Sequence, residues 1–497
     1  MSAADNFKAL LSAVGTGYVS STAYDTAWVA RLGEVDPDLA NRALHWLCAH
    51  QLPDGSWGAG APYHYHDRVI STLAAMIALT YRGRRAMDRS QIEKGLAALD
   101  YITGKATKAL RASEGMATVG FEMIVPTLVS EAESLGIIRQ QGDRILGRLG
   151  RLRQEKMSKL AGRKISRYIT AAHSAEMAGT DGLHLLDVEN LQEANGSVSN
   201  SPAATAYFSA YVNPGESHAL AYLRQVIDAR EGAAPSFAPF DIFERAWVLW
   251  NIALAKAHRD PEILALCQPH LDYLRSSWRE AQGLGFSAEN SLTDGDDTSV
   301  CFEVLSEFGS APDVEAVLSY EEENWFRCYG LEVNPSVGVN IHVLGALRAA
   351  GHTDKHPSVR KLLDFIRSQR MPGGYWIDKW HVSPYYTAAH AVILCRGFDD
   401  ALCKETAGWM LKTQQADGAW GSGGMPTAEE TAYCTQALCV WRAHGGKVPP
   451  GRIEQASFWL RNHSLPPYPP MWIDKSLYCP ELLVKSAILS ALALSEE

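Results

Sequence analysis

The stretches HWLCAHQLPDGSWGAG (residues 45–60) and GWMLKTQQADGAWGSG (residues 408–423) are two copies of one motif. Both carry Trp, Gln and then Asp-Gly-x-Trp-Gly at the same spacing. A weaker copy, FIRSQRMPGGYW (365–376), places its Gln369 45 positions before Gln414. That interval suits one pair of helices per repeat. The motif predicts helices that end in tight glycine turns, and its distant copies predict two separate helical barrels. Its simplest role is to brace helices without taking part in chemistry.

Helical patterning dominates the rest of the chain, and alternating strand-like runs are scarce. Apolar residues recur at i, i+3, i+4 and i+7 in DLANRALHWLCAHQ (38–51), RVISTLAAMIALTYRG (68–83), DIFERAWVLWNIALAKAH (241–258) and TAYCTQALCVWRAHGG (431–446). Gly, Pro and Asp turns separate these segments. The sequence therefore predicts an all-α protein.

Composition describes a folded chain of more than one domain. The 497 residues are 46% hydrophobic and 21% charged. A net charge of −10 argues against a nucleic-acid partner, which would favour a basic face. We find no signal peptide at the start and no apolar run of membrane-spanning length. Nine cysteines without a CxxC pair are typical of buried thiols in a reducing compartment, so we expect a cytoplasmic protein.

Three aspartates, Asp294, Asp296 and Asp297, crowd into SLTDGDDTSV (291–300), just before the apolar run VCFEVLSEFG. Neighbouring carboxylates repel, so at least one of them tends to keep its proton. The stretch could serve as a metal site, as a proton donor, or as a solvated helix start. For Asp294 and Asp297, helix capping is the alternative to a chemical role.

Together, the DxDD string, the QxxDGxWG turns, SSTAYDTAWVA (20–30) and ATVGFEMIVPTL (117–128) resemble the class II diterpene cyclases that act on geranylgeranyl diphosphate. LQEANGSV, DKWHVSPYYTAAH, AEETAYCTQAL and MWIDKSLYC are most similar to bacterial halimadienyl (tuberculosinyl) diphosphate synthases. The resemblance implies an isomerase (an intramolecular lyase) built from two α-barrels, called β and γ, with the active site between them. We place γ at residues 25–220 and β at 221–497, with residues 1–24 packing on β.

The resemblance also implies how the acid works. Protonating an isolated alkene requires a neutral, desolvated carboxylic acid aimed at one carbon. Asp296 corresponds to this general acid, and Asp294 and Asp297 tune and orient it. Asn340, in VGVNIHVLGAL, matches the family position that hydrogen-bonds the acid.

Aromatic rings stabilise the migrating cation by cation–π attraction. The candidates for lining the cavity are Trp325, Phe326, Trp376, Trp380, Tyr385, Tyr386 and Trp420, although any one of them could instead belong to the core.

Termination depends on a base. His173, in ITAAHSAEMAG, matches a histidine that works with an asparagine in plant copalyl diphosphate synthases, but the asparagine position falls at Ser236. Without that pair we expect hydride and methyl shifts before proton loss, giving a halimadienyl or clerodane (kolavenyl) skeleton. An ordinary structural histidine is the equal alternative.

The resemblance implies that the diphosphate survives, because class II chemistry leaves it intact, and consistently no DDxxD motif for its ionisation is present. The resemblance implies contacts from Lys164, Arg167 and Lys475, for each of which an exposed surface role is the alternative. It also implies Mg²⁺, held by an acidic motif of which Glu114 remains, with Glu122 in the GFE sequence. Asp67 is a weaker candidate that fits a structural pair with Arg68 better. The histidines show no zinc-ligand spacing.

Several alternatives stay open: a copalyl-type synthase, a squalene–hopene-like or drimenyl (sesquiterpene) class II cyclase, a zinc-dependent protein prenyltransferase β-subunit, and a non-enzymatic α-toroid binding protein. The expected partner is the isoprenoid diphosphate itself. A downstream class I terpene synthase or prenyl-transferring enzyme, a transient membrane-surface contact and the oligomeric state are left open.

Overall fold

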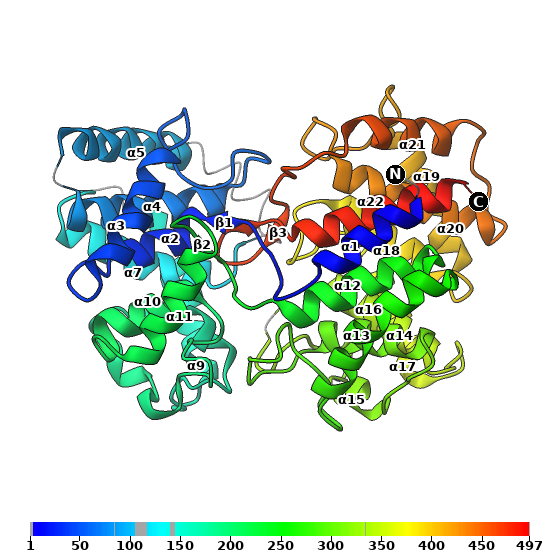
Figure 1. The fold of residues 1–497 in the computed structure, drawn as a ribbon, viewed down its shortest axis with the longest axis horizontal. Coiled ribbons are helices and arrows are strands. Elements are labelled where there is room, and N and C mark those ends of the chain that lie inside the picture. The colour runs from blue at the N-terminus through cyan, green and yellow to red at the C-terminus, as the bar shows by residue number, and fades with distance from the viewer. Residues whose placement is uncertain (1–2, 84, 105–116, 140–144, 333, 497) are drawn as a thin grey trace.

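A computed structural model describes residues 3–83, 85–104, 117–139, 145–332 and 334–496. Helices dominate these residues and form two bodies side by side (Figure 1). One buried core draws on residues from Ala23 to Ala238, and the other on Phe7 to Val19 together with Phe240 to Leu494. The all-α prediction is confirmed, and the two bodies are the expected γ and β domains.

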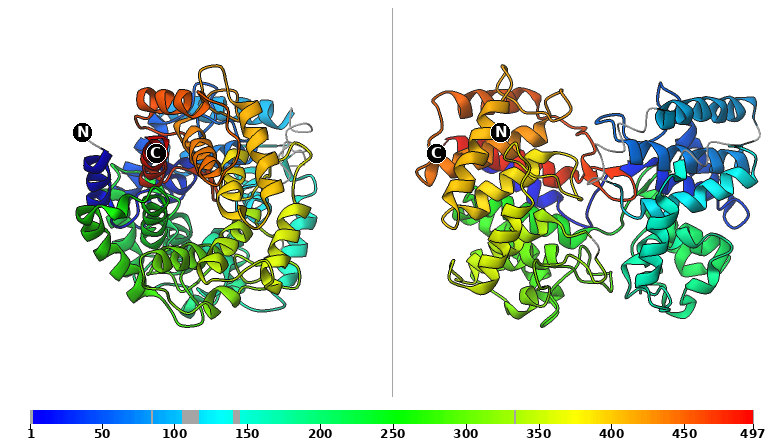
Figure 2. Two further views of the ribbon diagram at one scale, coloured as in Figure 1. Left: turned by 90° about the vertical axis from the view of Figure 1, so that its right-hand side faces the viewer. Right: turned by 180° about the vertical axis from the view of Figure 1, so that it is seen from behind.

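The β domain is a ring of helices, seen end-on in the left panel of Figure 2. Each inner helix packs on the next, and the last packs on the first. In order, the inner helices are α12 (Asp241–Leu254), α14 (Gly295–Glu307), α16 (Val337–Ala349), α18 (Pro384–Cys395), α20 (Ala428–Ala443) and α22 (Glu481–Glu496). Outer helices are α13 (Pro261–Ser277), α15 (Glu315–Leu318), α17 (Pro357–Ser368), α19 (Asp400–Thr413), α21 (Arg452–His463) and α1 (Ala3–Ala13). Helix α1 packs on α13 and α22, so the start of the chain belongs to this domain.

The γ domain is a smaller and less regular ring. Its inner elements are α2 (Ala23–Ala30), α4 (Tyr65–Arg82), α7 (Phe121–Ser134), the 3₁₀ segment η1 (Thr170–Ala178) and α10 (Pro202–Tyr207). Around them lie α3 (Pro37–Ala49), α5 (Ala86–Gly104), α9 (Leu149–Lys159), the π-helical turn η4 (Phe208–Val212) and α11 (Ser217–Asp228). Short 3₁₀ turns η2 (Leu183–Leu185), η3 (Val188–Asn190) and, in β, η5 (Ala257–Arg259) complete the described elements.

The repeat motif forms the same turn in both domains. The buried indoles of Trp57, Trp376 and Trp420 each donate to the backbone carbonyl ten residues earlier, at 2.8–2.9 Å. The glutamines of the two strong copies donate to the turn and to the next helix pair, for example Gln414 to the Gly418 and Arg452 carbonyls. In the weak copy, Trp376 makes the bond that Trp420 makes in the strong copy, so the two turns are 44 residues apart (420 − 376) and the interval of 45 taken from Gln369 and Gln414 is wrong by one.

A further copy lies in γ and was missed in the sequence. Gln192 donates to the Gly196 carbonyl, four residues ahead, as Gln414 does to Gly418. Its turn, EANGSV, has asparagine in place of aspartate and valine in place of tryptophan, so the motif is hard to see in letters.

The domains are joined by crossing segments. The boundary expected at residue 220 lies near residue 239, because α11 packs on α3 and the γ core continues to Ala238. Strand β1 (Ser21–Thr22) pairs antiparallel with β2 (Ala234–Pro235), where the chain enters and leaves γ. Strands β3 (Trp472–Ile473) and β4 (Leu477–Tyr478) form a hairpin that reaches from β into γ (Figure 1). Its Leu477 amide donates to Asp67, and Ile473 and Leu477 pack on Ala59.

Candidate active site

A cavity of about 140 Å³ lies where the two domains meet. The γ side contributes Val119, Thr170, His173, Ser199 and Phe237, and the β side contributes Phe240, Phe243, Phe286, Leu292, Asp294, Asp296, Asp297, Cys328, Tyr329, Trp380, Trp472, Ile473, Asp474 and Tyr478. The wall is therefore largely aromatic, with carboxylates at two places. An apolar pocket with a few converging polar groups is the usual form of a small-molecule site.

The three aspartates stand at the start of α14. Asp294 is the N-cap, and its Oδ1 accepts from the amides of Asp296 and Asp297 at 3.0 and 2.8 Å. Burial, followed by the charge of Asp296, raises the pKa of Asp294 to about 7. Burial and the charges of Asp294 and Asp296 raise the pKa of Asp297 well above its ordinary value. The capping interpretation is confirmed for Asp294, and the crowding of buried carboxyls keeps the pKa values of Asp294 and Asp297 high.

Asp296 is the member of the motif that meets a histidine. Its Oδ1 lies 2.5 Å from Nδ1 of His342, on α16, and its side chain is 16% exposed. The Nε2 atom of His342 lies 2.8 Å from Nδ1 of His390, on α18. The carboxyl thus has one oxygen held by an imidazole at the edge of the aromatic cavity.

The prediction that Asn340 hydrogen-bonds Asp296 is wrong. The Asn340 side chain accepts from the Phe326 amide and donates to the Phe326 and Ser336 carbonyls. Residues two apart on an α-helix point about 200° apart, so Asn340 and His342 cannot both face Asp296. His342 was not predicted from the sequence, although it stands two residues after Asn340 in VGVNIHVLGAL.

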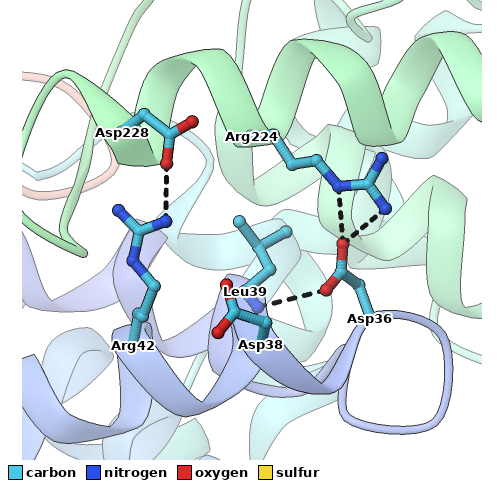
Figure 3. Close-up of a pocket in the computed structure, with 6 residues that line it drawn as sticks. All are labelled: Asp36, Asp38, Leu39, Arg42, Arg224 and Asp228. Carbon is cyan, nitrogen blue, oxygen red and sulfur yellow. Dashed lines mark hydrogen bonds and ion pairs between the residues drawn. The ribbon is translucent and has the colours of Figure 1, made fainter.

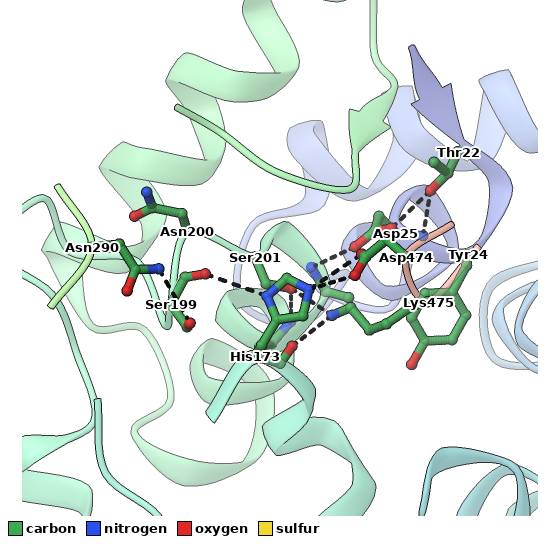
Figure 4. Close-up of polar contacts among 12 residues, drawn as sticks. Thr22, Tyr24, Asp25, His173, Ser199, Asn200, Ser201, Asn290, Asp474 and Lys475 are labelled. Atoms are coloured by element: carbon green, nitrogen blue, oxygen red, sulfur yellow. Dashed lines mark hydrogen bonds and ion pairs between the residues drawn. The ribbon is translucent and has the colours of Figure 1, made fainter. Parts of the chain in front are cut away.

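His173 faces the cavity from γ and bonds across the domain junction (Figure 4). Its Nε2 lies 3.0 and 3.2 Å from the two carboxylate oxygens of Asp474, and its Nδ1 lies 3.4 Å from the Ser199 carbonyl. Its ring stacks on Phe237, with centroids 5.1 Å apart. Ser236 is fully buried and is not among the residues that line the cavity. Asp474 was not foreseen, because its contact with His173 spans 301 positions.

Lys475 does not reach the cavity, which contradicts the phosphate contact expected of it. Its Nζ is fully buried between the Ser201 hydroxyl, the His173 carbonyl and Glu176, at 2.6, 2.8 and 3.0 Å (Figure 4). These three partners use all three donors of an ammonium group. Lys475 is therefore a domain-joining residue.

The other two cations lie nearer solvent. Lys164 is exposed, and Arg167 is half-buried and donates to the Gln192 carbonyl at 2.5 Å. Neither is among the residues that line the cavity.

Of the predicted aromatic residues, Trp380 lines the cavity. Trp376 and Trp420 are wholly buried in the repeat turns, and Tyr385 stacks on Trp409 with centroids 4.8 Å apart. Trp325 is half-buried beside Phe365, and Phe326 belongs to the β core. Tyr386 is buried among Trp472, His381 and His390. Trp376 and Trp420 were candidates both for bracing helices and for lining the cavity. Their burial in the repeat turns favours the bracing role.

Among the described residues, the structure does not bring together a magnesium site. Glu114 lies outside the described residues, and Glu122 is paired with Lys156. Asp67 accepts from the amides of Ala59 and Leu477, so its role is structural, but the pair expected with Arg68 is wrong, because Arg68 pairs with Asp54 at 2.9 Å. Within the described ranges, no group of three His, Cys, Asp or Glu side chains could hold a metal ion.

A second hollow lies on γ, between α3 and α11 (Figure 3). Of its five charged residues, four pair with one another: Arg42 with Asp228 at 2.5 Å, and Arg224 with Asp36 at 2.8 Å. Among the described helices, none is both long and apolar enough to cross a membrane.

Comparison with known proteins agrees with this architecture. Residues 328–440 match the family model described as the squalene-hopene cyclase C-terminal domain. The chain is 50% identical to a type B diterpene cyclase of Mycobacterium tuberculosis, over 99% of each chain. It is 32% identical to an ent-copalyl diphosphate synthase of Streptomyces sp. KO-3988, over 97% of this chain and 93% of that one. Among solved structures, ent-copalyl diphosphate synthase from Streptomyces platensis matches with a TM-score of 0.79 and 26% identity, over 100% of both chains. The protein belongs to the class II diterpene cyclases.

Proposed function

We propose that this enzyme cyclises geranylgeranyl diphosphate to a bicyclic C20 diphosphate, and that Asp296 supplies the initiating proton. The observation that carries the proposal is the carboxyl of Asp296 at the edge of an aromatic cavity, with its Oδ1 held by His342. The M. tuberculosis relative is named a diterpene cyclase and the Streptomyces relatives copalyl diphosphate synthases, which supports a C20 substrate.

The reaction balances as an isomerisation. The Asp296 proton adds to the terminal alkene of the prenyl chain, whose π electrons form the new C–H bond and leave a tertiary cation. Two ring closures each consume one alkene, and loss of a proton from carbon to a base ends the reaction. The diphosphate stays attached throughout. Rings such as Phe237, Phe286 and Trp380 stabilise the moving cation and exclude water.

For the product we propose a rearranged skeleton, halimadienyl or clerodane. Two observations support it. By the resemblance, Ser236 stands where the plant enzymes have their asparagine. In the structure, both ring nitrogens of His173 already face acceptor oxygens, on Asp474 and Ser199. A base with no free lone pair toward the cavity removes a proton slowly, so hydride and methyl shifts compete. A copalyl-type product is the alternative, and the names of the Streptomyces relatives favour it.

The diphosphate also needs positive charge. We propose Lys164 and Arg167 as its protein contacts, because point charges and guanidinium forks both suit phosphate oxygens. Glu114 would be a ligand of Mg²⁺, which would supply further positive charge to the diphosphate. We also propose a cytoplasmic location, because nine cysteines without a CxxC pair are typical of a reducing compartment. Because the product keeps its diphosphate, we propose that a class I synthase or a prenyl-transferring enzyme acts after this one.

The test is to incubate the protein with geranylgeranyl diphosphate, with and without Mg²⁺, then dephosphorylate the product and identify it by mass spectrometry and NMR. We expect a bicyclic diterpene alcohol from the wild type and none from Asp296→Asn. If farnesyl diphosphate or squalene were cyclised instead, the C20 assignment would be wrong. If Asp296→Asn still cyclised the substrate, the acid would lie elsewhere.

A further inference from the structure

Behind the proposed acid lies a buried row of two imidazoles, from α16 and α18. His342 and His390 are 2% and 1% exposed. The row runs from Asp296 Oδ1 to His342 Nδ1 at 2.5 Å, and from His342 Nε2 to His390 Nδ1 at 2.8 Å. The rings of Tyr386 and Trp250 cover His390, with centroids 4.5 and 5.0 Å away. His342 contacts Asp296, and His390 acts only through His342.

The direction of these two hydrogen bonds decides what Asp296 can do. A neutral imidazole carries one N–H, so one nitrogen donates and the other accepts. When Asp296 gives its proton to an alkene, the carboxylate left behind needs a donor, and Nδ1–H of His342 is in place. In that tautomer Nε2 of His342 is a bare lone pair, which can only accept. Its neighbour is Nδ1 of His390, so that atom must carry the hydrogen.

The reverse direction would disable the acid. If His390 Nδ1 were the acceptor, a neutral His342 would carry its hydrogen on Nε2 and present a lone pair to Asp296. The carboxyl would then direct its proton at His342 instead of the cavity. Burial keeps the pKa of His390 well below its ordinary value, so His390 is a neutral ring with a single N–H.

We propose that His390 is a positioning residue: its Nδ1–H fixes His342 in the Nδ1–H tautomer and so leaves the Asp296 proton on the oxygen that faces the substrate. This inference rests on the function proposed above. It extends that function by assigning a task to a histidine that no substrate atom touches.

The tautomer can be read without substrate. In ¹⁵N-histidine-labelled protein, long-range ¹H–¹⁵N spectra distinguish the two neutral tautomers from the imidazolium, and comparison with His342→Gln identifies the His342 signals. We expect a neutral His342 protonated on Nδ1. A His342 protonated on Nε2, or on both nitrogens, would overturn the proposal. This result is independent of whether the substrate has been chosen correctly.

Kinetics with matched variants give the second arm. His390→Asn can place an amide N–H where Nδ1–H stood, whereas His390→Leu removes the donor at similar bulk. We expect the Asn variant to keep kcat within about threefold and the Leu variant to lose roughly 100-fold in kcat, with KM little changed. Thermal unfolding shows whether each variant is folded. If the folded Asn and Leu variants had the same kcat, whether near that of the wild type or much lower, the proposed role of His390 would be refuted. Should the Leu variant not fold, the wild-type spectrum still decides. A wild type inactive on geranylgeranyl diphosphate would count against the proposed function alone.

Discussion

Lys475 Nζ lies 3.0 Å from Glu176 Oε1, and neither side chain is exposed to solvent. The lysine stands in the turn of the β3–β4 hairpin of β, whereas Glu176 belongs to η1 in the heart of γ. The Tyr24 hydroxyl donates to the same oxygen at 2.8 Å. The ion pair therefore fastens one domain into the other, next to the wall of the cavity.

Removing one partner of this pair leaves a buried charge uncompensated. We expect Lys475→Met to lower the free energy of unfolding by about 3–5 kcal/mol, measured by urea denaturation. Lys475→Met combined with Glu176→Gln should recover part of the loss, because position 176 then carries no uncompensated charge. If Lys475 instead held the diphosphate, the single variant would raise KM and leave stability unchanged.

Asn340 and His342 should separate stability from chemistry. Asn340→Ala strands the Phe326 amide and carbonyl, so we expect a loss of about 1–3 kcal/mol in unfolding free energy and nearly normal turnover in the folded fraction. His342→Phe removes the partner of Asp296, so we expect kcat to fall by roughly 100-fold or more. Both are measured by denaturation and single-turnover kinetics. Loss of kcat in a well-folded Asn340→Ala variant would restore the original assignment.

Asp297 should make stability depend on pH. Its folded pKa is raised above the unfolded value near 4, so folding takes up a proton. The stability that this proton uptake contributes is complete below about pH 4 and is lost as the pH rises toward the folded pKa of Asp297. Asp297→Asn cannot ionise and keeps an N–H donor. We therefore expect it to gain unfolding free energy over the wild type, by more at pH 8 than at pH 5, in guanidinium titrations. An equal difference at both pH values would mean that Asp297 titrates alike in the folded and unfolded chains.

Two aromatic residues give contrasting outcomes. Phe237 lines the cavity and stacks between His173 and Phe240, so Phe237→Ala should yield new or prematurely deprotonated products by mass spectrometry. Trp420 lies in a repeat turn, so Trp420→Phe should cost about 1 kcal/mol through the lost bond to the Met410 carbonyl and leave the products unchanged. A changed product spectrum from Trp420→Phe would place that ring in the reaction after all.

What could be read from the sequence was local. In the two strong copies, the Gln and Trp bond within their own repeat or to the next helix pair, so their spacing carries the barrel architecture. Asp294 caps α14 through amides two and three residues ahead, which is why the DxDD stretch marks a helix start as well as an acid.

What could not be read depends on contacts between distant segments. The choice between Asn340 and His342 is a matter of helix rotation, and nothing local fixes which side of α16 faces Asp296. Lys475 looked like a phosphate ligand because a lone lysine in an apolar stretch needs an anion; its partner Glu176 lies 299 positions away. The cavity wall mixes Val119, Phe237 and Trp472 from three separate regions, so periodicity could not single out its members.

The packing of α1 beside α22 has a consequence for how the chain is made. The ring of β closes only when its last helix meets α12 and α1, yet the γ core, residues 23–238, is complete long before then. During synthesis, γ can therefore fold while most of β is still emerging from the ribosome. Helix α1 can meet α13 once residues 261–277 have been made, but the part of its surface that packs on α22 must wait for the helix that is translated last.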